Sequence, residues 1–189
     1  MSDKKIIIGL VGKISAGKGT AADYLKDNYS ANTYRFSTML RDILNRLHLE
    51  VSRPNLQSIS ECLREKFSGD ILAKVIADDV KADPEKLLVI DGIRRQDDIK
   101  YLRELPEFKL VKIETDSKTR YQRLINRGEN QDDQKKTYEE FLQDEQREAE
   151  LEIPKVMESA QLALDNNSSR EKLYQQIDEL IKSLGYEQK

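Results

Sequence analysis

The stretch IIIGLVGKISAGKGT, residues 6–20, decides the fold of this chain. Its first part, residues 6–11, is almost continuously apolar and rich in β-branched side chains, which is typical of a strand buried on both faces of a parallel sheet. A glycine-rich turn over residues 12–19 follows, and after Thr20 apolar residues return at helical spacing. A buried strand, a turn and a helix in this order predict the first unit of an α/β fold.

The turn has the spacing of a phosphate-binding P-loop, in which glycine, four residues, glycine and lysine follow one another. Gly12, Gly17 and Lys18 satisfy this spacing, with Gly19 inserted before Thr20. Glycines let backbone N–H groups wrap around phosphate oxygens, and the dipole at the start of the next helix favours the same anion. A plain turn rich in small residues, the alternative, would not need Lys18 and Thr20 together.

The P-loop spacing predicts roles for individual residues. Lys18 supplies a mobile cation that can follow charge onto a transferring phosphoryl group, and Thr20 can hold Mg²⁺ directly or through a water molecule. Lys13 and Ser15 are weaker candidates, because each can also be ordinary loop surface. Lys18 is predicted to be catalytic, and the predicted ATP-binding residues are Gly12, Lys13, Ile14, Ser15, Ala16, Gly17, Lys18, Gly19 and Thr20.

Strand patterns and helical patterns alternate through the rest of the chain. Further strands are expected at residues 33–36, 87–90, 108–113 and 160–164, and helices at residues 37–82 with breaks, between Asp91 and Phe108, and at residues 117–127. Capping boxes of Thr137 with Glu140 and of Ser168 with Glu171 mark two later helix starts. This order predicts a parallel sheet with helices on both faces, in a single domain over residues 1–189.

One segment carries no apolar residue. Residues 128–136, with the sequence GENQDDQKK, cannot contribute to a core and are therefore a candidate for a short loop or lid.

The composition argues against several classes of protein. Lys and Arg total 32 against 35 Asp and Glu, so the net charge is −3, and no binding to nucleic-acid polymers or anionic membranes is expected. No apolar run of about 18 residues is present, and the N-terminus lacks the layout of a signal peptide, so a cytoplasmic protein is expected. Cys62, the one cysteine, is expected to face the core, and His48, the one histidine, gives no zinc cluster.

A second signal lies at residues 87–95, LLVIDGIRR, where an apolar run ends at Asp91. Ligands of open α/β sheets bind at the carboxyl ends of the strands, so Asp91 is predicted to be catalytic and to order the Mg²⁺ shell through water. Gly92 lets the chain turn close to the ligand, and Arg94 and Arg95 can fork onto an acceptor phosphate. The alternative is that Asp91 only caps the next turn and that both arginines are solvated.

Other arginines are candidates of the same kind. Arg120, Arg123 and Arg127 share one face of a predicted helix that leads into the lid candidate, so Arg123 and Arg127 are predicted to be catalytic by clamping phosphate oxygens when the lid closes. The alternative for this row is an ordinary solvated helix face. Further candidates, with the same alternative, are Arg41 and Arg64 for acceptor binding and Arg147 for the lid.

These motifs resemble those of a known enzyme family. Residues 12–20 resemble the phosphate loop of adenylate-kinase-like nucleoside monophosphate kinases, and residues 91–95 resemble their Asp-Gly-x-x-Arg segment, whose arginine binds the acceptor phosphate. Across most of the chain the sequence is similar to deoxynucleoside monophosphate kinases and dephospho-CoA-kinase-related proteins, and residues 123–148 resemble a poorly characterised group of the latter. Ser15, which replaces a common loop glycine, and the short lid depart from the family pattern.

The resemblance implies a P-loop NTPase fold with a central five-stranded parallel sheet, a helical acceptor-binding region at residues 37–85 and a lid at about residues 128–136. It also implies ATP and Mg²⁺. We therefore predict an ATP-dependent kinase that moves the γ-phosphate to a small nucleotide-type acceptor, a (deoxy)nucleoside monophosphate, and that works as a monomer or homodimer. The alternatives are phosphorylation of a hydroxyl, as in dephospho-CoA kinase, and a P-loop NTPase switch or nucleotide-binding regulator without an acceptor.

Overall fold

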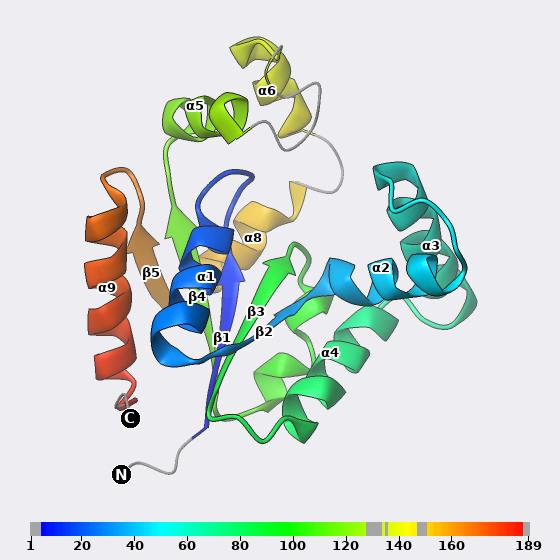
Figure 1. The fold of residues 1–189 in the computed structure, drawn as a ribbon, viewed down its shortest axis with the longest axis horizontal. Helices are drawn as coiled ribbons and strands as arrows, with labels where there is room; N and C mark the ends of the chain where they lie inside the picture. Colours follow the sequence, from blue (N-terminus) through cyan, green and yellow to red (C-terminus); the bar gives the residue numbers. More distant parts are fainter. Residues whose placement is uncertain (1–4, 128–133, 135, 147–150, 187–189) are drawn as a thin grey trace.

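Five parallel strands form one sheet at the centre of the molecule. The computed structural model describes residues 5–127, 134, 136–146 and 151–186. The strands are β1 (Ile6–Val11), β2 (Asn32–Arg35), β3 (Leu87–Ile93), β4 (Phe108–Glu114) and β5 (Leu162–Asp165). Their order across the sheet is β2-β3-β1-β4-β5, with every neighbouring pair parallel (Figure 1). The predicted α/β fold with a five-stranded parallel sheet is confirmed.

The central strand β1 is buried along its whole length. Ile7 pairs with Leu88 of β3 on one side and with Phe108 of β4 on the other, so both edges of β1 are occupied by neighbouring strands. Helices then cover both of its faces, which explains why the sequence of β1 is continuously apolar and does not alternate.

Helices pack on the two faces of the sheet in separate apolar layers (Figure 1). Helices α1 (Lys18–Tyr29) and α9 (Arg170–Ser183) cover one face. Helices α2 (Phe36–Arg46), α4 (Ile71–Ala82) and α8 (Ile153–Glu158) cover the other, with α3 (Arg53–Lys66) packed against α2 and α4. Helices α5 (Ser117–Arg127) and α6 (Tyr138–Asp144) pack on each other beyond the carboxyl ends of the strands.

The expected helix between Asp91 and Phe108 is wrong. Two short 3₁₀ turns, Asp97–Ile99 and Leu102–Glu104, take its place. The Asp98 carboxylate accepts hydrogen bonds from the backbone N–H groups of Arg94 and Arg95, so the chain closes into a turn and does not extend into an α-helix. The chain therefore passes from β3 to β4 through two 3₁₀ turns and without an α-helix.

Two other expectations are corrected. Ser169, one residue later than predicted, caps α9, because its side chain accepts the hydrogen bond from the N–H of Lys172. Cys62 is exposed, because the stripe that α3 packs against the core consists of Leu56, Ile59 and Leu63.

The described helices include none with the length and apolar character needed to cross a membrane. Nearly all of the predicted lid, residues 128–136, lies outside the described residues; only residues 134 and 136 of it fall within them.

Candidate functional site

The loop between β1 and α1 curls at the carboxyl end of the central strand. Gly17 has φ of +103°, a conformation that glycine adopts without strain. At Gly12 a Cβ atom would lie 2.8 Å from the carbonyl oxygen of Ile113 on β4, so only glycine fits there. The N–H of Ala16 donates to the carbonyl of Lys13 at 3.1 Å and closes the turn. The glycine spacing seen in the sequence thus produces a tight loop that leads into a helix N-terminus.

Ser15 lies at the tip of this loop with φ of +57°, in the left-handed region. A non-glycine residue in this region costs about 1 kcal/mol. The position is the one at which the sequence departs from the glycine of the resembled family. Its Oγ atom is buried and has no hydrogen-bond partner among the described residues.

Lys18 folds back over the mouth of the loop. Its Nζ donates to the carbonyl oxygens of Gly12 at 2.6 Å and of Lys13 at 3.1 Å. Beside it, a Cβ atom added to Gly19 would meet no atom within 4 Å, so the protein leaves open space next to the first turn of α1. Thr20, the other predicted ligand, is half-buried on the same turn.

The loops after β4 and β5 brace the curled loop from outside. The carbonyl oxygen of Ala16 accepts two hydrogen bonds, from Thr115 Oγ1 at 3.0 Å and from Asn166 Nδ2 at 2.8 Å. The sequence analysis missed Thr115 and Asn166. Their only signal was position, because each lies two residues after the end of a predicted strand.

Asp91 lies on β3 at the carboxyl edge of the sheet, where it was predicted, but it is not alone there. Its Oδ2 forms an ion pair of 2.9 Å with Nη2 of Arg35, and its Oδ1 accepts the N–H of Gly92 at 2.7 Å. Arg35 and Asp91 face each other in the register of β2 and β3. Sequence reasoning missed Arg35, although it belonged to the predicted second strand, whose carboxyl end meets this edge. The role of Asp91 toward Mg²⁺ stays a prediction.

The predicted acceptor arginines are only partly brought together. Arg94 and Arg95 follow β3, and the carboxylate of Asp98 accepts both of their backbone N–H groups, at 2.9 and 3.0 Å. Arg64 reaches the same turn, with its guanidinium 3.4 Å from Asp98 and also bonded to the carbonyl of Gly69. Arg64 is therefore a brace of the turn that presents the two arginines. Arg41 is exposed on α2.

The arginines of α5 have different surroundings, although they share a sequence spacing. Arg120 is only 2% exposed, and it donates to the carbonyls of Thr115 at 3.0 Å and Ile14 at 3.4 Å. A solvated face is the wrong description of Arg120. Arg123 is half-buried and donates to Asn166 at 3.4 Å, and burial lowers its pKa against the opposing pull of Asp116. The side chain of Arg127 and all of Arg147 lie outside the described residues.

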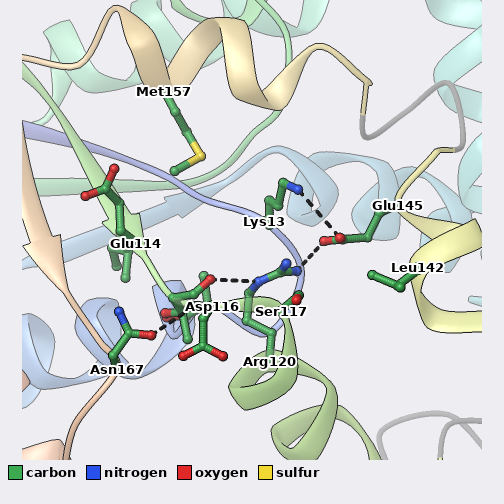
Figure 2. Close-up of a pocket in the computed structure, with 12 residues that line it drawn as sticks. Lys13, Glu114, Asp116, Ser117, Arg120, Leu142, Glu145, Met157 and Asn167 are labelled. Carbon is green, nitrogen blue, oxygen red and sulfur yellow. Dashed lines mark hydrogen bonds and ion pairs between the residues drawn. The ribbon is translucent and has the colours of Figure 1, made fainter. Parts of the chain in front are cut away.

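A cleft of about 510 Å³ opens beside the loop, and Figure 2 shows the side chains that line it. Glu145, just after α6, reaches between Lys13 and Arg120, forming an ion pair of 3.5 Å with the former and a shorter one with the latter. Leu142 and Met157 add apolar side chains to the lining of the cleft. The Glu145 carboxylate thus links the curled loop to the α6 region across the cleft.

Aromatic side chains hold α6 on α5. Phe141 is buried against Tyr121 and Tyr138, and the Tyr138 hydroxyl lies 2.6 Å from that of Ser117. The predicted capping box of Thr137 and Glu140 is present at the start of α6 and confirms that helix start. Glu145 therefore follows a helix that is packed against α5 through these contacts.

Comparison with known sequences decides the family. The sequence profile of a family described as AAA domain matches residues 8–152, more than half of the chain. The chain belongs to the AAA domain family. This AAA domain is also 28% identical over 180 residues to a UPF0200 protein of Methanoculleus marisnigri, covering 95% of this chain and 97% of the relative. A UPF0200 protein of Thermococcus kodakarensis is 30% identical over 138 residues, 70% of this chain and 74% of the relative.

Solved structures agree with the fold of this AAA domain. The shikimate kinase of Bacteroides thetaiotaomicron superposes with a TM-score of 0.64 at 15% identity, covering 96% of this chain and 99% of that one. The protein TT1252 of Thermus thermophilus gives a TM-score of 0.61, also at 15% identity, over 96% of this chain and 99% of that one. At this level of identity the likeness shows the fold, which is P-loop kinase-like.

Proposed function

We propose that this AAA domain is an ATP-dependent kinase that transfers the γ-phosphate of ATP to a small nucleotide-type acceptor, namely a (deoxy)nucleoside monophosphate. One observation carries the proposal: a curled glycine loop at the carboxyl end of the central strand, with Lys18 across its mouth and a helix N-terminus behind it. Backbone N–H groups, a helix dipole and an ammonium group converge there, and this combination favours a polyphosphate.

The loop residues bind the phosphates in this proposal. Lys18 exchanges its two carbonyl partners for phosphate oxygens, which are stronger acceptors because they carry charge. Loop N–H groups supply further donors without side-chain rearrangement, since the glycines at 12 and 17 already set the curl. The loop therefore needs little reorganisation on binding.

The residues around the loop also fit a magnesium ion. Thr20 offers a hydroxyl and Asp91 a carboxylate, and oxygen ligands with retained water are what Mg²⁺ prefers. Open space adjoins Gly19 on the first turn of α1, next to Thr20. Bound there, Mg²⁺ would neutralise charge on the β- and γ-phosphates. We assign Thr20 and, through water, Asp91 to this role.

The acceptor side favours a phosphate over a hydroxyl as the reacting group. A hydroxyl acceptor, as in dephospho-CoA, benefits from a general base, for which Asp91 is the nearest candidate. That carboxylate already pairs with Arg35 and accepts the N–H of Gly92. A phosphate acceptor is ionised beforehand and needs no base. It would instead use cations, which Arg41, Arg94 and Arg95 supply on this side.

The test is ATP turnover with a panel of acceptors: deoxynucleoside monophosphates, nucleoside monophosphates and dephospho-CoA. Strong stimulation by a monophosphate supports the proposal, and stimulation by dephospho-CoA alone assigns the hydroxyl reaction. ATP hydrolysis that no acceptor changes would point to a switch or regulator. Absence of calorimetric binding of a magnesium–ATP analogue would overturn every one of these readings.

A further inference from the structure

Asn166 lies in the connection from β5 to α9, yet its side chain reaches the curled loop. It is 5% exposed, and its backbone N–H donates to the carbonyl of Glu114 at 2.8 Å, which ties it to the end of β4. Its Nδ2 donates to the carbonyl of Ala16 at 2.8 Å, and its Oδ1 accepts from Nη2 of Arg123 at 3.4 Å. One buried amide thus contacts both the loop and the α5 arginine.

The second loop glycine, Gly17, makes room for this amide. A Cβ atom at Gly17 would lie 2.1 Å from Asn166 Nδ2, far inside contact distance. Because Gly17 has no side chain, the side-chain amide of Asn166 can pack against it. With Asn166 in this place, a residue larger than glycine does not fit at position 17.

Holding the carbonyl of Ala16 has a geometric consequence. In a planar trans peptide the C=O and the next N–H point in opposite directions. Asn166 and Thr115 both hydrogen-bond this carbonyl from the side of the β4 and β5 loops. The N–H of Gly17 is therefore aimed away from those loops, which is the direction in which a donor can serve a ligand held by the curl.

The guanidinium of Arg123 has one hydrogen-bond donor group that no described residue uses. Its Nη2 is used by Asn166, while its Nη1 is buried without a hydrogen-bond partner among the described residues. A buried donor left unpaired costs about 1–3 kcal/mol, so a ligand acceptor at Nη1 would recover that energy. Asn166 holds the guanidinium through Nη2 and so limits the orientations open to Nη1.

We propose that Asn166 is a positioning residue that aligns two nucleotide contacts at once, the N–H of Gly17 and the guanidinium of Arg123. The inference rests on the proposed nucleotide binding. A carboxamide satisfies both neighbours, because it offers a donor to the Ala16 carbonyl and an acceptor to the Arg123 guanidinium. Aspartate has the same shape but would place an oxygen against the Ala16 carbonyl.

The main experiment is calorimetric binding of a non-hydrolysable ATP analogue with Mg²⁺ to the full chain. We expect Asn166→Asp to weaken binding about 10-fold or more, the effect of removing one hydrogen bond of a charged ligand. Asn45→Asp, the same substitution at an exposed site on α2, should leave binding unchanged. Equal affinity of wild type and Asn166→Asp overturns the inference, whereas no binding by wild type overturns the proposed function itself.

A double-mutant cycle separates positioning from mere structural support. If Asn166 acts through Arg123, the loss of affinity from Asn166→Ala should be smaller in an Arg123→Ala background than in wild type. Fully additive losses contradict the proposal.

A second measurement does not require a folded Asn166 variant. Arg123→Ala should shift the amide resonance of Gly17 in the ¹H–¹⁵N spectrum, because the change passes through the Asn166 amide. Lys118→Ala, an exposed change on the same helix, should not. An unshifted Gly17 resonance in Arg123→Ala overturns the inference.

Discussion

At the carboxyl edge of the sheet, the side formed by β1, β4 and β5 is built differently from the side formed by β2 and β3. On the side of β1, β4 and β5, polar groups are buried and bonded to one another: Arg120 and Asn166 are nearly inaccessible, and the Ala16 carbonyl receives two donors. On the side of β2 and β3, Arg41 and Arg94 are exposed, and Asp98 accepts the backbone N–H of Arg94. The loop side is thus held by buried polar contacts, whereas the other side presents cations at the surface.

This contrast separates a loop whose shape the protein sets before binding from arginines that lie exposed to solvent. A preformed loop loses little conformational entropy on binding, so it can hold a ligand common to many reactions. Exposed arginines lose side-chain freedom when they bind, so their affinity depends on how well the particular acceptor matches them. We expect substitutions on the first side to affect both folding and every ligand, and those on the second to affect one ligand only.

Lys18→Ala should have the largest effect on activity. Loss of the ammonium group removes transition-state charge stabilisation, for which about 10³-fold in turnover is expected. Folding should be little changed, because the hydrogen bonds of Lys18 to the carbonyls of Gly12 and Lys13 lie within its own loop. Steady-state kinetics with Lys26→Ala, an exposed site on the same helix, as control would check this. Wild-type turnover in Lys18→Ala would remove the loop from the chemistry.

Arg120→Ala should have the largest effect on stability. It leaves the Glu145 carboxylate without its buried partner and removes the donors to Thr115 and Ile14. Breaking a buried ion pair costs about 3–5 kcal/mol. Urea denaturation should show this loss, and Arg103→Ala, an exposed arginine, should show almost none. Equal midpoints of the two variants would mean that the loop side is not braced as described.

Arg95→Ala should act on one substrate. A charged hydrogen bond to an acceptor phosphate is worth about 1.5–3 kcal/mol, so the acceptor KM should rise roughly 10- to 100-fold while the KM for ATP stays the same. Arg46→Ala, exposed at the end of α2, is the matched control. Equal increases in both KM values would show that Arg95 does not act on the acceptor alone. The contrast between the loop side and the β2–β3 side of the sheet would then be weaker.

Cys62→Ala should have the smallest effect. The side chain is exposed on α3, and surface substitutions usually change stability by less than about 0.5 kcal/mol. The native thiol should react with a water-soluble disulfide reagent at the rate of a free surface cysteine. Protection of the native thiol until the protein unfolds would show that α3 and its neighbours are packed more tightly than the structure has them.

The sequence predicted those features that depend on local pattern. The bounds of β1 and α5 and the capping box at Thr137 agree with the structure, because each follows from apolar periodicity or a short-range hydrogen bond. The glycine–lysine spacing likewise predicted a curled loop before a helix, which the structure contains.

Contacts between distant segments were out of reach of the sequence. Asn166 is 150 positions from Ala16, and Glu145 is 25 positions from Arg120, so no periodicity connects either pair. Arg120 shows the limit clearly. Its spacing from Arg123 predicted a shared face, yet burial against Glu145 gives it a bracing role that spacing alone does not reveal.

The pairing of Asp91 with Arg35 has a consequence for encounter with substrates. An unpaired carboxylate at the edge of the sheet would repel each approaching nucleotide, since every such molecule is an anion. Here the acid brings its own counter-cation from the adjacent strand, so the pair adds no net charge. Under the proposed function, the arginines on this side would then attract an incoming anion, although the chain as a whole is slightly acidic.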